Sequence, residues 1–159
     1  METGRIPLCQ MLESFQRPKG ELPLTWRRRA NVESALASLR AAGHRPDTDT
    51  FVVNAAASSG RCHIMSNRSP CITASHFDGH WITSRRRGFT SVELRRLFGF
   101  PASYSRGGLS KAQFGRCLGN SMDVRLMAEL LREVLIASRL AKRNKSLICP
   151  FRYPHESSR

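Results

Sequence analysis

The segment from Arg87 to Pro101 constrains the fold most, because it carries both the start and the stop signals of a short helix. Thr90 and Glu93 have the spacing of a capping box, in which the Thr hydroxyl accepts from the Glu93 N–H and the Glu93 carboxylate reaches back to the Thr90 N–H. Gly99, followed closely by Pro101, ends the helix. So short a helix cannot form a core alone. The sequence therefore predicts a rigid corner, helical over 91–98, between larger parts of the fold.

Two more segments accompany this corner at characteristic distances. Ser69-Pro70-Cys71-Ile72-Thr73-Ala74-Ser75 precedes it, and Gly119-Asn120-Ser121-Met122 follows it. Together the three segments resemble the end of the target-recognition region and the last two signature motifs of DNA (cytosine-5) methyltransferases. The resemblance covers about residues 60–137. Three segments in the expected order are a far more specific signal than any one of them.

The motifs that carry catalysis in this family do not occur in the sequence. There is no glycine-rich loop after a strand, no Pro-Cys-Gln nucleophile loop and no Glu-Asn-Val segment. Leu8-Cys9-Gln10 is only superficially similar to the nucleophile loop, because Leu stands where the family has Pro. The chain thus resembles the C-terminal portion of such an enzyme, either a truncated gene product or a genuine short protein. We expect no catalytic residue in it and no methyl transfer by the chain alone.

The resemblance implies a mixed α/β chain, in which an irregular, strand-rich recognition unit is followed by helices. It would be a fragment of a Rossmann-like, S-adenosylmethionine-dependent methyltransferase. Residues 1–49 are expected to form a connector with one helix, and residues 50–87 part of the target-recognition region. Residues 88–142 would hold the C-terminal motifs and a closing helix. Residues 143–159 would form a disordered basic tail.

The resemblance also assigns roles to particular residues. It places Asn120 and Ser121 at the S-adenosylmethionine pocket, where a helix N-terminus would favour the cofactor carboxylate. It implies DNA contacts for Arg68, Cys71, Ile72, Thr73, Arg85 and Arg86. Most family members have Thr at position 71, and a thiol is a poorer hydrogen-bonding group. It implies structural roles for Arg87, which can pair with Glu93, and for Thr90, Glu93, Arg96, Gly99, Pro101 and Gly119.

The charge of the chain agrees with a polyanionic partner. The sequence has 26 Lys and Arg residues against 12 Asp and Glu residues, a formal net charge of +14. Such a charge attracts nucleic acid, so DNA and a catalytic methyltransferase half are the expected partners. An acidic partner would also explain it. A second hypothesis is a stand-alone basic DNA-binding module without catalysis.

The remaining elements follow from periodicity and turn signals. A helix is predicted over 31–42, with Asn31 as N-cap and Gly43 at its end. The basic run 26–29 before it is interpreted as a solvated linker rather than a phosphate contact. Short strands are predicted over 50–56, 62–65, 71–74 and 80–83, and a helix capped by Ser110 ends at Gly119. The last helix should run from Ser121 or Met122 to about 142, with an unpartnered apolar stripe.

A third hypothesis is a zinc-stapled interaction domain. Cys62, Cys71, His76 and His80 could supply four ligands, but only the two histidines have zinc-like spacing. We therefore predict no metal. The five cysteines show no close pairing, no signal peptide is evident and no apolar run could span a membrane. The expectation is an intracellular protein with reduced thiols, nuclear if the host is eukaryotic.

Overall fold

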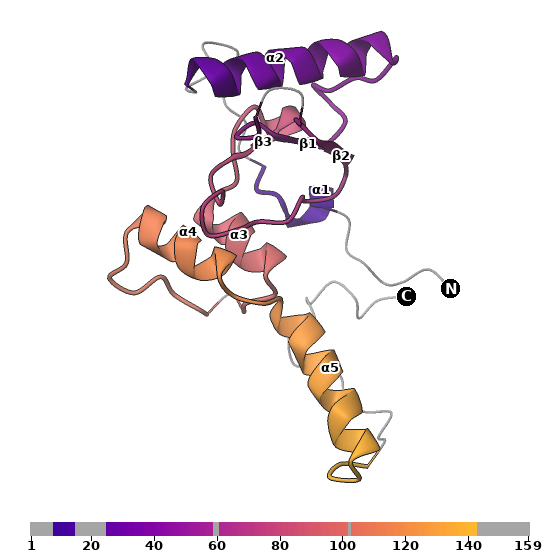
Figure 1. The fold of residues 1–159 in the computed structure, drawn as a ribbon, viewed down its shortest axis with the longest axis vertical. Helices are drawn as coiled ribbons and strands as arrows, with labels where there is room; N and C mark the ends of the chain where they lie inside the picture. The colour runs from indigo at the N-terminus through magenta and orange to yellow at the C-terminus, as the bar shows by residue number, and fades with distance from the viewer. Residues whose placement is uncertain (1–7, 15–24, 59–60, 102, 143–159) are drawn as a thin grey trace.

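The computed structural model of the chain describes residues 8–14, 25–58, 61–101 and 103–142. Figure 1 shows a small sheet between one long helix and a group of shorter helices, with a further helix extending away from them. The elements in chain order are α1 (Leu8–Met11), α2 (Trp26–Ala41), β1 (Phe51–Asn54), β2 (Ile64–Ser66), β3 (His80–Ile82), the 3-10 helix η1 (Thr83–Arg85), α3 (Ser91–Leu97), α4 (Lys111–Gly119) and α5 (Val124–Ala137).

The sheet has three antiparallel strands in the order β2-β1-β3. Successive residues of the central strand β1 point to opposite faces, so two cores form. Val53 packs with Trp81 under α2, together with Val32 and Ala35 of that helix. On the other face Val52 belongs to a larger core built from α1, β3, α3, α4 and the loops between them: Leu8, Leu12, Val52, Ile72, Ile82, Phe89, Leu94, Phe114 and Leu118.

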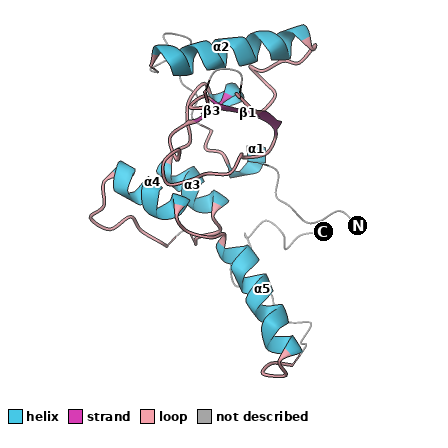
Figure 2. Ribbon diagram, in the orientation of Figure 1, coloured by secondary structure: helices cyan, strands magenta, loops and turns pink. Residues whose placement is uncertain are grey.

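The mixed class of helices with a small sheet is confirmed, and helices dominate it (Figure 2). Three of the four predicted strands are present in shortened form. The strand predicted over 71–74 is wrong: Ile72 is buried, but the chain then turns, with the His76 N–H donating to the Thr73 carbonyl at 3.1 Å. This apolar segment therefore packs the Ile72 side chain into the larger core and forms no strand of the sheet.

Helix α2 begins five residues before the predicted start. Thr25 is its N-cap, so Trp26 and the three arginines after it form its first turn and are not a linker. Asn31 is not an N-cap. It is buried, and its amide donates to the Ala55 and Ala57 carbonyls at 3.0 and 2.9 Å, which ties the helix to the chain leaving β1. Gly43 follows the helix at φ +81°, as its predicted end requires.

Helix α5 begins at Val124, capped by the Asp123 carboxylate, and ends at Ala137. The predicted start at Ser121 or Met122 and the predicted end near 142 are both wrong. The predicted apolar stripe is present and none of the helix is buried: Leu126, Leu130, Leu131, Val134 and Leu135 are all exposed. The helix leaves the rest of the fold, to which the Val124 N–H is joined by a bond to the Phe98 carbonyl at 3.0 Å (Figure 1).

The division of the chain predicted after residue 49 falls just before β1, and the one predicted after residue 87 falls at the end of the turn that follows η1. Residues 143–159, predicted to form a disordered basic tail, lie outside the described residues. Among the described residues, no helix has the length and apolar character needed to cross a membrane.

Candidate functional site

A buried ion pair stands at the centre of the motif segment. Arg87 donates from both terminal nitrogens to the Glu93 carboxylate, at 2.8 and 2.9 Å. The two side chains are only 6% and 0% exposed. The predicted pairing of Arg87 with Glu93 is thus confirmed, and it joins the segment between the sheet and α3 to the first turn of that helix.

The predicted capping box is confirmed as part of the same group. The Glu93 N–H donates to the Thr90 hydroxyl at 3.2 Å, and the Thr90 N–H donates to the Glu93 carboxylate at 2.8 Å. The Thr90 hydroxyl donates in turn to the Glu13 carboxylate at 2.8 Å. Ser110 and Gln113 form a second capping box at the start of α4. Both helices therefore have firmly determined starting points.

The N-terminal segment completes this centre, and sequence reasoning missed it. The Glu13 N–H donates to Glu93 at 2.8 Å, while Arg87 donates to the Glu13 carbonyl at 3.3 Å. Arg96 donates to the Met11 carbonyl at 3.1 Å, which gives this motif arginine a structural role. The only local signal was the i, i+4 spacing of Leu8 and Leu12, which both enter the larger core. We call Glu13, Arg87, Thr90, Glu93 and Arg96 the motif centre.

The electrostatics of the motif centre favour an ionised Glu93. Burial by itself raises the pKa of the carboxyl. The Arg87 hydrogen bonds, the N–H groups of Thr90 and Glu13, and the charge of Arg87 together outweigh burial and hold the pKa below its ordinary value. A buried ion pair of this kind adds little net stability, and its main effect is to favour one geometry of the side chains. Loss of either partner would leave an unpaired charge in the core.

Arg85 and Arg86 stand directly before this centre. The backbone of Arg86 is left-handed, with φ +52°, and its N–H donates to the Thr83 carbonyl at 3.1 Å. Both side chains are partly exposed, but the Nε of each is buried and has no hydrogen-bond partner among the described residues. A buried donor without an acceptor is costly. An oxygen ligand arriving at this turn would supply the acceptor.

Hydrogen bonds to residues at the start of β1 hold the turn that carries these arginines. The Thr83 hydroxyl donates to the Asp49 carbonyl at 3.0 Å and accepts from the Phe51 N–H at 3.1 Å. The hydroxyls of Ser84 and Thr50 lie 2.9 Å apart. These contacts hold η1 against the start of β1, so the two guanidinium groups extend from a rigid base.

The recognition segment is a loop with mixed exposure. Arg68, Cys71 and Thr73 are exposed, as a DNA contact requires. Ile72 is 8% exposed and its side chain anchors the loop in the core, so the DNA contact predicted for this residue would come from its backbone.

Two glycines of α4 support this loop. A Cβ on Gly119 would lie 2.3 Å from the Ala74 N, and one on Gly115 would lie 2.1 Å from the Phe77 ring. The predicted structural role of Gly119 is confirmed: α4 needs glycine there because the backbone of the recognition loop passes against it.

The position of Ser121 differs from the expectation. Its hydroxyl donates to the Leu118 carbonyl at 2.7 Å, which places Ser121 at the end of α4 and not at the start of α5. The amide groups of the first turn of α5 are taken by Asp123, which accepts from the Arg125 and Leu126 N–H groups at 2.9 and 3.0 Å. An Asp is a strong N-cap, and its charge opposes a second carboxylate. Asn120 is exposed at the end of α4.

Gly99 and Pro101 end α3 as predicted. Gly99 has φ +72°, its N–H donates to the Arg96 carbonyl at 3.0 Å, and a Cβ there would lie 3.1 Å from Arg125. Pro101 is exposed immediately after it. The glycine therefore serves both the helix end and the close approach of α5.

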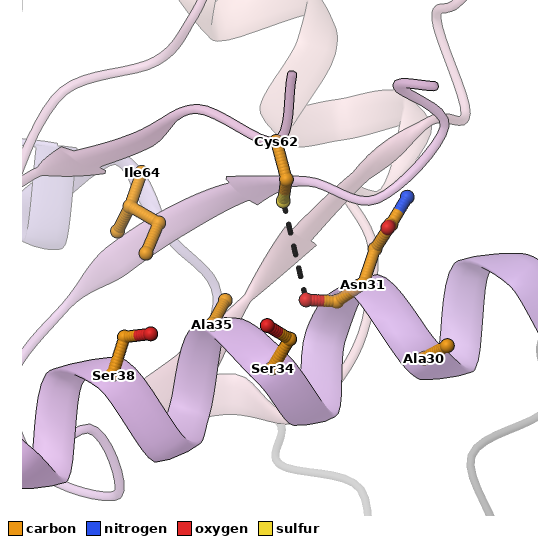
Figure 3. A pocket seen from close by; sticks show the side chains of 7 residues that line it. All are labelled: Ala30, Asn31, Ser34, Ala35, Ser38, Cys62 and Ile64. Atoms are coloured by element: carbon orange, nitrogen blue, oxygen red, sulfur yellow. Dashed lines mark hydrogen bonds between the residues drawn. The ribbon is translucent and has the colours of Figure 1, made fainter. Parts of the chain in front are cut away.

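The four residues of the zinc hypothesis do not gather. Cys62 packs against the core under α2, with its Sγ 3.5 Å from the Asn54 carbonyl oxygen. Burial raises the pKa of its thiol. In Figure 3 it faces a cavity of about 380 Å³ beside Asn31 and small residues of α2. Cys71 is exposed on the recognition loop. Across the described part of the chain, no three His, Cys, Asp or Glu side chains are placed to hold a metal ion.

Comparison with known proteins adds nothing to these observations: no protein-family model matches the chain, and no curated protein or solved structure matches it either. An assignment to a family therefore depends on the motif residues and on the contacts that they make in this fold.

Proposed function

We propose that this chain is the C-terminal part of a DNA (cytosine-5) methyltransferase, which contacts DNA and completes a catalytic half. The support comes from the motif residues, which act as one unit in the fold. Arg87, Thr90 and Glu93 share a buried hydrogen-bond network, and Gly119 is fitted to the recognition loop.

The observation that carries the DNA-binding part is the state of Arg85 and Arg86. Two adjacent guanidinium groups stand on a fixed turn, and each keeps a buried Nε donor without an acceptor in the described parts of the chain. Guanidinium donors match the oxygens of a phosphate. Arg68 and Thr73 of the recognition loop are further exposed polar groups that could contact DNA. Phosphate contacts of this kind fix position and give little sequence preference.

The catalytic half would dock on the apolar stripe of α5. Leu130, Leu131 and Val134 are 53%, 54% and 61% exposed, which is unusual for leucine and valine on one face of a helix. The complete enzyme would take cytosine out of the duplex and transfer methyl from S-adenosylmethionine. Asn120 and Ser121, between α4 and α5, would lie at the edge of the cofactor pocket. A nuclear location would follow for a eukaryotic host.

Duplex DNA binding tests the proposal directly. The variant carrying Arg85→Ala and Arg86→Ala should bind a fluorescent duplex more weakly, and similarly for unrelated sequences. Its plot of log K against log salt should be flatter by up to about two units, since each lost phosphate contact removes about 0.9. Unchanged affinity in this variant contradicts the proposal.

A matched control removes the same formal charge elsewhere. Arg132 and Arg139 lie on or just beyond α5, away from the arginine turn, and Arg132 is already paired with Glu129 and Glu133. Their double replacement by Ala should leave the salt slope within a few tenths of the wild-type value. An equal loss in both variants would indicate attraction by net charge and no built site.

A further inference from the structure

A second cavity opens at the start of α2, away from the arginine turn. Its volume is about 340 Å³, within the range of small-ligand sites. Its walls come from three segments that are distant in the chain, and Ala56 after β1 is the only contribution of one of them. The helix contributes Thr25, Trp26, Arg27 and Arg28, and the turn after the recognition loop contributes Ser75 and His76.

An ion pair holds the helix and this turn together. Arg28 donates from both terminal nitrogens to the Asp78 carboxylate, each at 3.3 Å. The pair is partly exposed, so its main consequence here is geometric. It fixes the end of the turn against the helix and also neutralises the charge of Asp78.

Trp26 lines this cavity, and most of its indole is exposed. It is 78% exposed, whereas the second tryptophan, Trp81, is 3% exposed in the core under α2. The Arg27 guanidinium lies 5.8 Å from the centre of the Trp26 ring. An indole with a cation beside it is a good platform for a flat, electron-rich ring, and a base stacked there would bury apolar surface that is now wet.

The polar groups of the cavity suit an anion. No carboxylate of the described residues pairs with Arg27, and α2 has no acidic residue in its first turn. His76 Nδ1 lies 2.9 Å from the Ser75 hydroxyl and 3.4 Å from the Thr73 hydroxyl, which fixes the imidazole at the mouth. Arginine, hydroxyl and imidazole donors together recognise phosphate oxygens.

We infer that this cavity binds one unpaired nucleotide of a DNA strand, with its base stacked on Trp26 and its phosphate held by Arg27, Ser75 and His76. The inference rests on the proposed function, because an enzyme that extrudes a base leaves unstacked nucleotides beside the target. A nucleotide within a stacked duplex has no free base face and does not fit. The site continues the recognition loop, since Thr73, Ser75 and His76 belong to one turn.

The two tryptophans provide a built-in reporter. A short, unlabelled thymidine oligonucleotide, which has no stable secondary structure, is titrated into the full chain while tryptophan emission is recorded. Stacking on Trp26 should quench the emission, and Trp26→Leu should abolish this change because the remaining Trp81 is buried. Fluorescence anisotropy with a labelled oligonucleotide should show about a five- to hundredfold loss of affinity in Trp26→Leu. Trp26→Tyr, which keeps an aromatic face, should retain most of the affinity.

Charge variants separate this site from general attraction. Arg27→Ala should weaken binding and reduce the salt slope by about 0.7, the value of one phosphate contact to a single strand. Arg40→Ala at the other end of α2, also exposed, should change neither. Wild-type affinity in Trp26→Leu, or equal losses in Arg27→Ala and Arg40→Ala, would overturn the inference.

The arginine turn gives an independent comparison. The variant with Arg85→Ala and Arg86→Ala should lose duplex binding and keep the quenching by the oligonucleotide. If wild-type chain fails to bind duplex while Trp26 is still quenched, the proposed function falls and the nucleotide site stands. If duplex binding depends on Arg85 and Arg86 while oligonucleotide quenching is absent, only the nucleotide site falls.

Discussion

The motif centre and α5 are opposite kinds of structure within one chain. Around Glu93 every polar group of the carboxylate is paired, and the N-terminal segment is drawn over it by bonds to Glu13. Along α5 an equally regular pattern of leucines and valines is left exposed by the described residues, and no residue of the helix is buried. The first region shows what this chain completes by itself. The second shows an apolar face that the described residues leave uncovered, and on which we propose that a partner docks.

Breaking the ion pair should give the largest loss of stability. Glu93→Gln leaves Arg87 charged and partly unsatisfied in the core, so the free energy of unfolding should fall by about 3–5 kcal/mol. Urea unfolding, followed through the buried Trp81, measures it. Glu129→Gln on α5 removes an exposed partner of Arg132 and should cost less than about 1 kcal/mol. Similar losses in the two variants would remove the contrast between the regions.

The coupling of the pair can be measured separately. A cycle with Arg87→Met, Glu93→Gln and the double variant should show the double variant to be more stable than the sum of the single losses implies. Additive losses would mean that the pair does not interact, whatever its geometry.

Lowering the pH should destabilise the part of the fold that contains the sheet and α3, and should not affect α5. Burial, with the nearby charge of His76, lowers the pKa of His80 from 6.5 to about 4, against an opposing effect of Asp78. Between these values the unfolded chain binds more protons than the folded one. Stability is therefore full above about pH 6.5 and falls by about 3 kcal/mol as the pH approaches 4.

Glu93 extends this dependence to lower pH. Its pKa is below 4.5 in the fold, so its contribution is present above 4.5 and is lost as the pH falls through the folded value. Unfolding free energies between pH 7 and 4 check the histidine part, and His80→Gln should flatten the curve in that window. A wild-type curve that is already flat there would refute it.

Thr90→Ala should have a moderate effect. It removes the cap of α3 and the bond to Glu13 while leaving the ion pair in place, so about 0.5–2 kcal/mol is expected. Ser110→Ala, which removes a capping box on an exposed helix start, should fall near the lower end of that range. If Thr90→Ala lowered the free energy of unfolding by less than Ser110→Ala does, the hydrogen bond from Thr90 to Glu13 would contribute nothing to stability.

These contrasts also explain what the sequence could predict. Capping signals are local, so the capping box of Thr90 with Glu93 and the cap at Ser110 were correctly identified from the sequence alone, although the part of Gln113 was not. Glu13 was missed because its partners lie 74 to 80 residues away, and nothing in its neighbourhood signals them.

Local rules failed where two signals competed. Asn31 has the residue type of an N-cap, but its side chain is buried and joins α2 to the chain after β1. The last helix was predicted to begin at Ser121 or Met122, whereas its N-cap is Asp123. The apolar run around Ile72 fits either a strand or a buried loop. The sequence around it does not distinguish the two, because the core residues that Ile72 contacts lie far away in the chain. The exposed stripe of α5 was predictable from periodicity, because an amphipathic pattern depends only on the spacing of its own residues.

The smallest effect on the isolated chain should come from α5 itself. Leu131→Glu together with Val134→Glu places charges on positions that are already exposed, so the unfolding free energy should change by less than about 0.5 kcal/mol. The same variant becomes decisive once a partner is present, because two charges would then be buried in the contact.

Reconstitution of methyl transfer tests the central claim most directly. The chain is mixed with a catalytic half carrying the glycine-rich and Pro-Cys-Gln motifs, duplex DNA and labelled S-adenosylmethionine. The account predicts no labelled cytosine with the chain alone, labelled cytosine with both halves, and loss of that activity with Leu131→Glu and Val134→Glu. Labelled cytosine from the chain alone, or undiminished activity of the α5 variant in the mixture, would contradict it.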